Sequence, residues 1–243
     1  MVVQIYPEHD TLSLHLAGTI VAEISNNPTT VLCLATGDTP RLAYRLMADS
    51  IRKEGVDCSQ CIFVGLDEWV GIPPEDDGSC AFFLRSNVFD PLGIRADQIK
   101  LFDATASDVK SECDSMASFI REKGGIDLMV VGIGMNGHIG FNEPGATESS
   151  RVRVVDLDLT TQEVGQKYFK KATMLSRGFT WGIQDMLESR RIILAASGET
   201  KADIVRETLQ GSIGPEVPAS FVRKHKNALI MLDEGAASSL TLV

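Results

Sequence analysis

The chain has 243 residues, 44% of them hydrophobic and 23% charged, which is ordinary for a globular protein. Its formal net charge of −10 argues against nucleic acids and anionic membranes as partners, because both bind basic surfaces. No apolar run approaches the roughly 20 residues that cross a bilayer. The first residues lack the basic stretch and apolar core of a secretory signal, so we expect a cytoplasmic location.

Apolar runs of β-branched character alternate along the chain with helix-like patterns. In the first long helical pattern after a strand, Thr39 is expected at the N-cap and Pro40 at the first helical position. In chain order the pattern predicts a helix over 10–25, a strand over 30–35, a helix beginning at 39–40, a strand over 61–66, helices over 79–90 and 107–123, strands over 126–133 and 152–157, helices over 160–170 and 180–188, a strand over 191–197, a helix over 199–210 and a strand over 227–232.

This alternation predicts an α/β fold with a doubly wound, mainly parallel sheet and helices on both faces, a Rossmann-like three-layer arrangement. We see no repeat or long linker, so residues 1–243 are expected to form one domain. In such sheets, ligands bind at the carboxyl ends of the strands. Four polar or glycine-rich segments follow predicted strands and should share that rim: 36–40, 67–69, 134–143 and 197–201.

Two of these segments are strand–turn–helix junctions that suit an anion. Thr36, Gly37 and Thr39 offer backbone N–H groups in front of a helix, although a tight turn with a helix cap explains the same residues. Asp38 would repel a phosphate and is expected to point to solvent. Lys201 near a helix N-terminus is unfavourable unless an anion lies there, so it is either a phosphate contact or an ordinary surface lysine.

The segment Asp67-Glu68-Trp69 places two acids at the end of a strand. One of them can act as a general base, and the indole can exclude water from it. A solvated strand end with a packed indole is the alternative.

The loop 132–145 gathers an imidazole, a carboxylate and amides in a stretch too rich in glycine to be explained by packing. His138 is the candidate for proton transfer, with Glu143 to orient or charge it. The spacing Gly132-x-Gly134-x-x-Gly137 imitates the dinucleotide fingerprint, but the glycines and proline at 140–145 exclude the helix that the fingerprint requires. The four histidines are dispersed, so no metal site is expected.

Together these segments resemble the glucosamine/galactosamine-6-phosphate deaminase (isomerase) family. The resemblance is carried by Leu34-Ala35-Thr36-Gly37-x-Thr39-Pro40, by Leu66-Asp67-Glu68-Trp69, by the loop from Gly132 to Gly145, and by Pro218-Ala219-Ser220. Trp69, Lys123-Gly124-Gly125-Ile126-Asp127 and Ser176-Arg177-Gly178 look closer to the galactosamine branch.

The resemblance implies isomerisation of an amino-hexose 6-phosphate coupled to loss of ammonia, without cofactor or metal. By position, Asp67 matches the base that moves a proton between C2 and C1, and His138 the residue that opens the pyranose ring, with Glu143 as its partner. The phosphate is expected on residues 36–40 with Lys201. The family includes monomers and oligomers, so a homo-oligomer is left open.

Three positions depart from the family pattern. Asn136 stands where some members have an aspartate, Lys167 where the glucosamine enzymes have a phosphate-binding arginine, and Asp38 where a small residue is usual. An amide can orient His138 but cannot help to hold a positive charge on it. A lysine lacks the bidentate fork of arginine. These changes bear on substrate recognition more than on the reaction.

Two other functions remain as alternatives. One is a hydrolase of the same fold that resembles 6-phosphogluconolactonases. The other is a sugar-phosphate sensor without activity, for which the acidic chain offers no DNA-binding segment.

Overall fold

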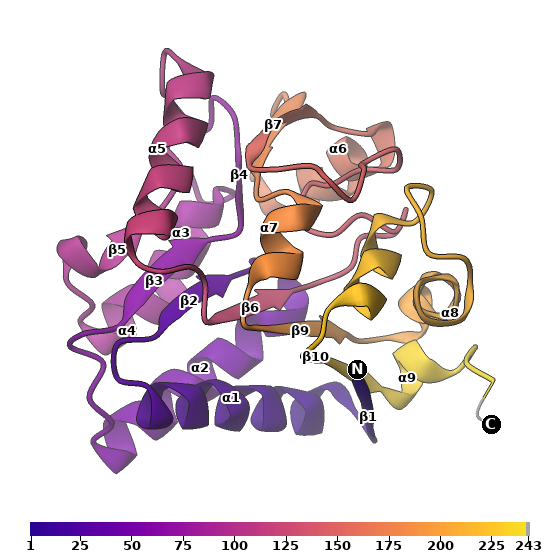
Figure 1. The fold of residues 1–243 in the computed structure, drawn as a ribbon, viewed down its shortest axis with the longest axis horizontal. Helices are drawn as coiled ribbons and strands as arrows, with labels where there is room; N and C mark the ends of the chain where they lie inside the picture. The colour runs from indigo at the N-terminus through magenta and orange to yellow at the C-terminus, as the bar shows by residue number, and fades with distance from the viewer. Residues whose placement is uncertain (242–243) are drawn as a thin grey trace.

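The computed structural model describes residues 1–241, which are arranged around a seven-stranded, wholly parallel sheet (Figure 1). The strand order β1-β10-β9-β6-β2-β3-β5 contains several crossovers, as a doubly wound sheet requires. The α/β fold class predicted from the sequence is confirmed. The strands are β1 (Val2–Tyr6), β2 (Val31–Leu34), β3 (Ile62–Gly65), β5 (Ile99–Lys100), β6 (Leu128–Val131), β9 (Arg191–Ala196) and β10 (Ala228–Asp233).

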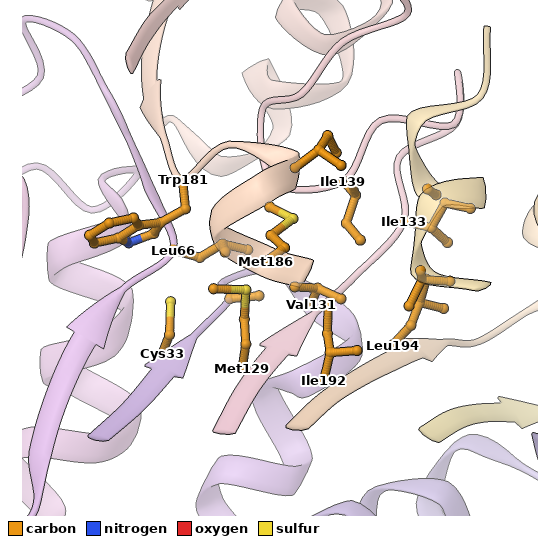
Figure 2. Close-up of a cluster of buried hydrophobic side chains, with 14 of the residues drawn as sticks. Cys33, Leu66, Met129, Val131, Ile133, Ile139, Trp181, Met186, Ile192 and Leu194 are labelled. Carbon is orange, nitrogen blue, oxygen red and sulfur yellow. The ribbon is translucent and has the colours of Figure 1, made fainter. Parts of the chain in front are cut away.

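Both faces of the central strands are buried, and successive residues enter different cores. In β2, Cys33 joins one hydrophobic cluster while Leu32 and Leu34 join the other. In β6, Met129 and Val131 point into the same layer as Cys33, where Figure 2 shows them beneath Trp181 and Met186. This two-sided burial explains why these strands are uniformly apolar.

Helices cover the two faces of the sheet (Figure 1). The long pair α1 and α2 packs on one face, and α5 and α7 lie on the other. Within residues 1–241, no helix combines the length and the apolarity needed to cross a membrane. The α-helices are α1 (His9–Asn26), α2 (Asp38–Glu54), α3 (Cys80–Leu84), α4 (Asp90–Leu92), α5 (Val109–Glu122), α6 (Leu159–Gly165), α7 (Ile183–Glu188), α8 (Ala202–Gln210) and α9 (Glu234–Ala237).

Several predicted helices are divided in the structure. A π-helical segment over Arg85–Phe89 joins α3 to α4, so the helix predicted over 79–90 has three parts. Short 3₁₀ helices occupy Ala96–Gln98, Gln166–Tyr168, Glu199–Lys201 and Pro218–Lys224, two of them replacing the ends of predicted α-helices.

A second, three-stranded antiparallel sheet has the order β4 (Asp67–Trp69), β8 (Arg177–Thr180) and β7 (Arg153–Asp156). The strand predicted over 152–157 belongs to this sheet and not to the parallel one. The chain passes from β3 into β4 after a single residue, Leu66. The small sheet therefore stands at the carboxyl edge of the large one and brings Asp67 there.

The expected cap of α2 is wrong. The helix begins at Asp38, and the N-cap is Gly37, whose φ of 114° is accessible to glycine but strained for other residues. Thr39 and Pro40 therefore lie inside the first turn. Gly37 has no side chain, so the first N–H groups of α2 lack a side-chain cap and face the cavity described below.

Candidate active site

A cavity of about 790 Å³ opens at the carboxyl edge of the parallel sheet. All four segments that follow predicted strands contribute to its wall, so the shared rim expected from the sequence is confirmed. Nine of the ten predicted site residues line it: Thr36, Gly37, Asp38, Thr39, Asp67, Asn136, His138, Lys167 and Lys201. The tenth, Glu143, lies behind His138.

Asp67 is the first residue of β4 and presents its carboxyl group to the cavity. Burial, with a smaller contribution from the charge of Glu68, raises the pKa of Asp67 to about 7. The thiol of Cys80 acts in the opposite direction by donating a hydrogen bond to Oδ1 at 3.5 Å. A carboxyl group with a pKa near neutrality is suited to take up and return a proton.

Glu68 has a different task from Asp67, although both lie at the same strand end. It is 2% exposed, and its carboxylate accepts the backbone N–H groups of Trp69 at 2.9 Å, Cys80 at 3.0 Å and Ala81 at 2.8 Å. Burial raises its pKa, and these three bonds oppose the rise. Glu68 thus fixes the start of α3 and does not line the cavity.

The indole of Trp69 is packed, but the strand end around it is buried and not solvated as the alternative interpretation expected. The ring packs against Phe141 and Phe169, with centroid distances of 4.6 and 6.2 Å, and also forms part of the cavity wall.

His138 and Glu143 form a pair in the glycine-rich loop. His138 Nδ1 lies 3.4 Å from Glu143 Oε2 and 3.0 Å from the hydroxyl of Thr161. Burial raises the pKa of Glu143, but the hydrogen bond and charge of His138 outweigh it, so the net pKa is lowered. An ionised Glu143 can orient the ring and stabilise an imidazolium.

Asn136 acts on this pair in a way that the sequence did not suggest. Its amide Nδ2 donates to Glu143 Oε2 at 2.8 Å, and its Oδ1 accepts the backbone N–H of His138 at 3.2 Å. The side chain therefore holds the carboxylate and the backbone of the loop, and not the imidazole ring.

The glycines of this loop make room for the ring. A Cβ at Gly134 would lie 2.2 to 2.4 Å from ring atoms of His138, so any side chain there would displace the imidazole. The first helix after Gly137 is α6, twenty-two residues further on, which agrees with the rejection of the dinucleotide fingerprint.

The junction at Thr36–Asp38 differs from the expectation in the position of Asp38. Its exposed carboxylate does not simply face solvent but binds Lys167 Nζ at 2.7 Å and Arg41 at 3.4 Å. Burial would raise the pKa of Asp38, but the contact with Lys167 outweighs it and the net pKa is lowered. Two residues predicted for the phosphate site therefore pair with each other.

Lys201 is not an ordinary surface lysine. It lies at the end of the 3₁₀ helix Glu199–Lys201, and its Nζ donates to the backbone oxygen of Ile133 at 2.7 Å. Burial first, and the charge of Lys167 second, lower its pKa to about 8. It forms no ion pair with a carboxylate of residues 1–241, so its charge is available to an anion in the cavity.

Other cavity residues escaped the sequence reasoning. Cys80 and Thr161 contact Asp67 and His138, and Arg41 and Tyr168 stand near the phosphate junction. They come from helices or their flanks, where no strand-end pattern marks them. Among the described residues there is no cluster of three or more His, Cys, Asp or Glu side chains that could hold a metal.

Comparison with known proteins gives consistent matches. Residues 9–231 match the family model described as glucosamine-6-phosphate isomerases/6-phosphogluconolactonase. A protein named glucosamine-6-phosphate deaminase from Rhodopirellula baltica is 40% identical over 98% of this chain and 95% of its own length.

Solved structures agree with this. One described as a monomeric glucosamine-6-phosphate deaminase is 33% identical, with a TM-score of 0.96 over 99% of this chain and 100% of that chain. A 6-phosphogluconolactonase from Trypanosoma brucei is 18% identical, with a TM-score of 0.79 over 99% of this chain and 98% of that chain; it shares the fold.

Proposed function

The chain belongs to the glucosamine-6-phosphate isomerase/6-phosphogluconolactonase family, and we propose that its cavity binds and deaminates an amino-hexose 6-phosphate. The protein is a deaminating isomerase: the aminated aldose phosphate and one water give a ketohexose phosphate and ammonia. The observation that supports this most strongly is the presence in one cavity of a His138–Glu143 pair and of Asp67 with a pKa of about 7.

Ring opening is assigned to His138. The imidazole takes the proton of the C1 hydroxyl and delivers one to the ring oxygen O5, so the C1–O5 bond breaks and C1 becomes an aldehyde. Glu143 keeps the ring oriented and offsets its charge during the transfer. Asn136 holds Glu143 in place.

Isomerisation is assigned to Asp67. Its carboxylate removes the proton from C2 while the aldehyde oxygen O1 takes a proton from the protonated amino group, giving an enolamine with a hydroxyl at C1. Asp67 then returns its proton to C1, which leaves a hydroxymethyl group there and a protonated imine at C2. Water adds to that imine and ammonia leaves. The step needs a carboxylate that is ionised when substrate binds yet holds the proton in the intermediate, which a pKa of about 7 allows.

The substrate phosphate is assigned to the open N–H groups of Gly37 and the first turn of α2, together with Lys201 and Lys167. A helix N-terminus and two ammonium groups supply positive potential in a chain whose net charge is −10.

We propose glucosamine 6-phosphate as the preferred substrate. Of the three features that look closer to the galactosamine branch, only Trp69 lines the cavity; segments 123–127 and 176–178 do not. The relative from Rhodopirellula baltica and the monomeric enzyme are both described as glucosamine-6-phosphate deaminases. The preference for galactosamine 6-phosphate expected from the sequence therefore has a single supporting residue in the cavity, Trp69.

The test is ammonia release from glucosamine 6-phosphate and galactosamine 6-phosphate by the wild type, Asp67→Asn and His138→Gln. We expect release from at least one sugar, faster from glucosamine 6-phosphate, and a loss of about 10³-fold or more in kcat for Asp67→Asn, because the proton shuttle is removed. Faster lactone hydrolysis would favour the lactonase alternative. Binding without turnover would favour a sensor.

Two further properties stay predictions. The similar solved enzyme is described as monomeric, which favours a monomer over the homo-oligomer left open by the sequence; light scattering of the purified protein would decide. A cytoplasmic location is testable by cell fractionation.

A further inference from the structure

Cys80 lies between the phosphate junction and the catalytic base. It is 5% exposed and is the first residue of α3. The hydroxyl of Thr36 donates to its Sγ at 3.3 Å, and the thiol donates to Asp67 Oδ1 at 3.5 Å. These contacts form a short chain of hydrogen bonds from Thr36 through Cys80 to Asp67.

We propose that Cys80 is a positioning residue that holds the Asp67 carboxylate through its S–H group. This inference rests on the proposed role of Asp67 as the base. Cys80 gives the carboxyl of Asp67 its one recorded hydrogen bond within residues 1–241. The thiol thus determines both the direction in which the carboxyl points and how readily it ionises.

The backbone that carries the thiol is held in place at the start of α3. Glu68 accepts the backbone N–H of Cys80 at 3.0 Å, and the hydroxyl of Ser79 caps α3 by accepting the N–H of Phe82 at 2.9 Å. Burial, together with the charges of Glu68 and Asp67, raises the pKa of the Cys80 thiol well above its usual value. Cys80 therefore stays a neutral donor, and its sulfur is not poised as a nucleophile.

The chain also constrains Thr36. A hydroxyl has one proton to donate. Because Thr36 gives that proton to Cys80, the substrate phosphate is left with the backbone N–H groups of the junction and not the hydroxyl. The phosphate junction and the base are thereby connected by side chains.

The experiment compares Cys80→Ala and Cys80→Ser with the wild type by the pH dependence of kcat for glucosamine 6-phosphate. The ionised base is active, so the rate rises with pH through the pKa of Asp67. Removing the donor destabilises the carboxylate, and we expect the midpoint of the acidic limb to rise by about 0.5–1 pH unit in Cys80→Ala and to stay within about 0.3 unit in Cys80→Ser, whose hydroxyl donates as the thiol does. At high pH, the two variants should differ by less than about fivefold.

The matched control is Cys113→Ala, a similar truncation of a buried thiol that lies in the core and not at the cavity. It should leave the midpoint unchanged even where it lowers thermal stability. The phosphate of the substrate titrates equally with every variant, so differences in midpoint belong to the enzyme. If the acidic limb of the kcat profile of Cys80→Ala superimposed on that of the wild type, the inference would be overturned. A uniform loss of rate at all pH values would also contradict it, because it would indicate a packing role alone.

Thr36→Val gives a second readout. If the Thr36 hydroxyl donates to the Cys80 thiol, the midpoint of the acidic limb should rise in Thr36→Val, by less than in Cys80→Ala. KM should change less than about twofold. A tenfold rise in KM with an unmoved limb would mean that the hydroxyl binds phosphate, against the inference. Retained activity of Asp67→Asn would instead refute the proposed base, which separates the two failures.

Discussion

Asp67 lies where β3 passes into β4, and burial there raises its pKa to about 7. In an unfolded chain an aspartate has a pKa near 3.9. Between these values the folded state keeps the proton that the unfolded state releases. The free energy of unfolding therefore falls as pH rises through this window, so the base is held at a cost in stability.

Asp67→Asn should remove that cost. We expect the free energy of unfolding at pH 8 to rise by on the order of 1–2 kcal/mol, a value discounted for cavity water, and to change little near pH 4. Urea unfolding at both pH values measures it, and the exposed Asp49→Asn is the control. An equal effect at both pH values would contradict the buried-charge explanation.

Lys201 gives a second prediction at the residue scale. Burial lowers its pKa to about 8, and a bound phosphate dianion stabilises its charged form. KM should be constant below pH 8 and rise up to about tenfold per unit above it, as free Lys201 loses its proton. Lys201→Gln should have a raised KM at pH 7, and its KM should not rise further above pH 8. Measuring KM from pH 6.5 to 9.5 tests both expectations. If KM of Lys201→Gln still rose above pH 8, the rise would belong to the titration of another group.

At the scale of elements, Asp38 joins the start of α2 to the 3₁₀ helix Gln166–Tyr168 through Lys167. The pair is exposed, so it contributes little to stability, about 1 kcal/mol at most. Its importance is electrostatic, because the Asp38 carboxylate pairs with Lys167 and places a negative charge beside the open N-terminus of α2, where the substrate phosphate would bind.

Asp38→Asn should therefore lower KM by about two- to fivefold and leave kcat unchanged, since one repulsive charge is removed. Asp49→Asn, on the same helix but away from the cavity, is the control. Initial rates at two ionic strengths provide the measurement, with a smaller difference at high salt. A higher KM would mean that Asp38 positions Lys167 for the phosphate.

The sequence predicted the central strands well because two-sided burial leaves a long apolar signal, as in β2 and β6. It did not reveal β4 or β8. The sequence of β4 is Asp-Glu-Trp and β8 contains a glycine, so neither has the apolar pattern of a buried strand. Both segments become strands because tertiary contacts pair them with each other.

The same distinction holds at the site. Asp67, His138 and Lys201, which line the cavity, could be predicted because polar residues stand out after apolar strands. Cys80 and Thr161 approach from the first turns of α3 and α6, and their contacts depend on how those helices are oriented. The α2 cap was mispredicted because Thr39 has a favourable side chain for a cap, while the turn at Gly37 requires a positive φ.

At the scale of the whole molecule, the small sheet shares the core of the large one. Trp181, just past β8, is 2% exposed in the main cluster and donates from Nε1 to the backbone oxygen of Gly65 in β3 at 3.0 Å. Trp69 lies instead in the separate cluster beside the small sheet. We propose that the two sheets unfold together, as one domain over residues 1–243 would.

The two tryptophans make this testable because each reports on one region. Single-tryptophan variants Trp69→Phe and Trp181→Phe, followed by fluorescence in urea, should each give a transition that coincides with the loss of helical circular dichroism in the same variant, within about 0.2 M. Coincidence follows because the packing of Phe179 and Trp181 in the main core, and the bond from Trp181 to Gly65, cannot persist once the parallel sheet opens. If Trp69 in the Trp181→Phe variant became exposed at clearly lower urea than the helices melt, the small sheet would be a separate unit, and the cavity wall that it supplies would open before the fold is lost.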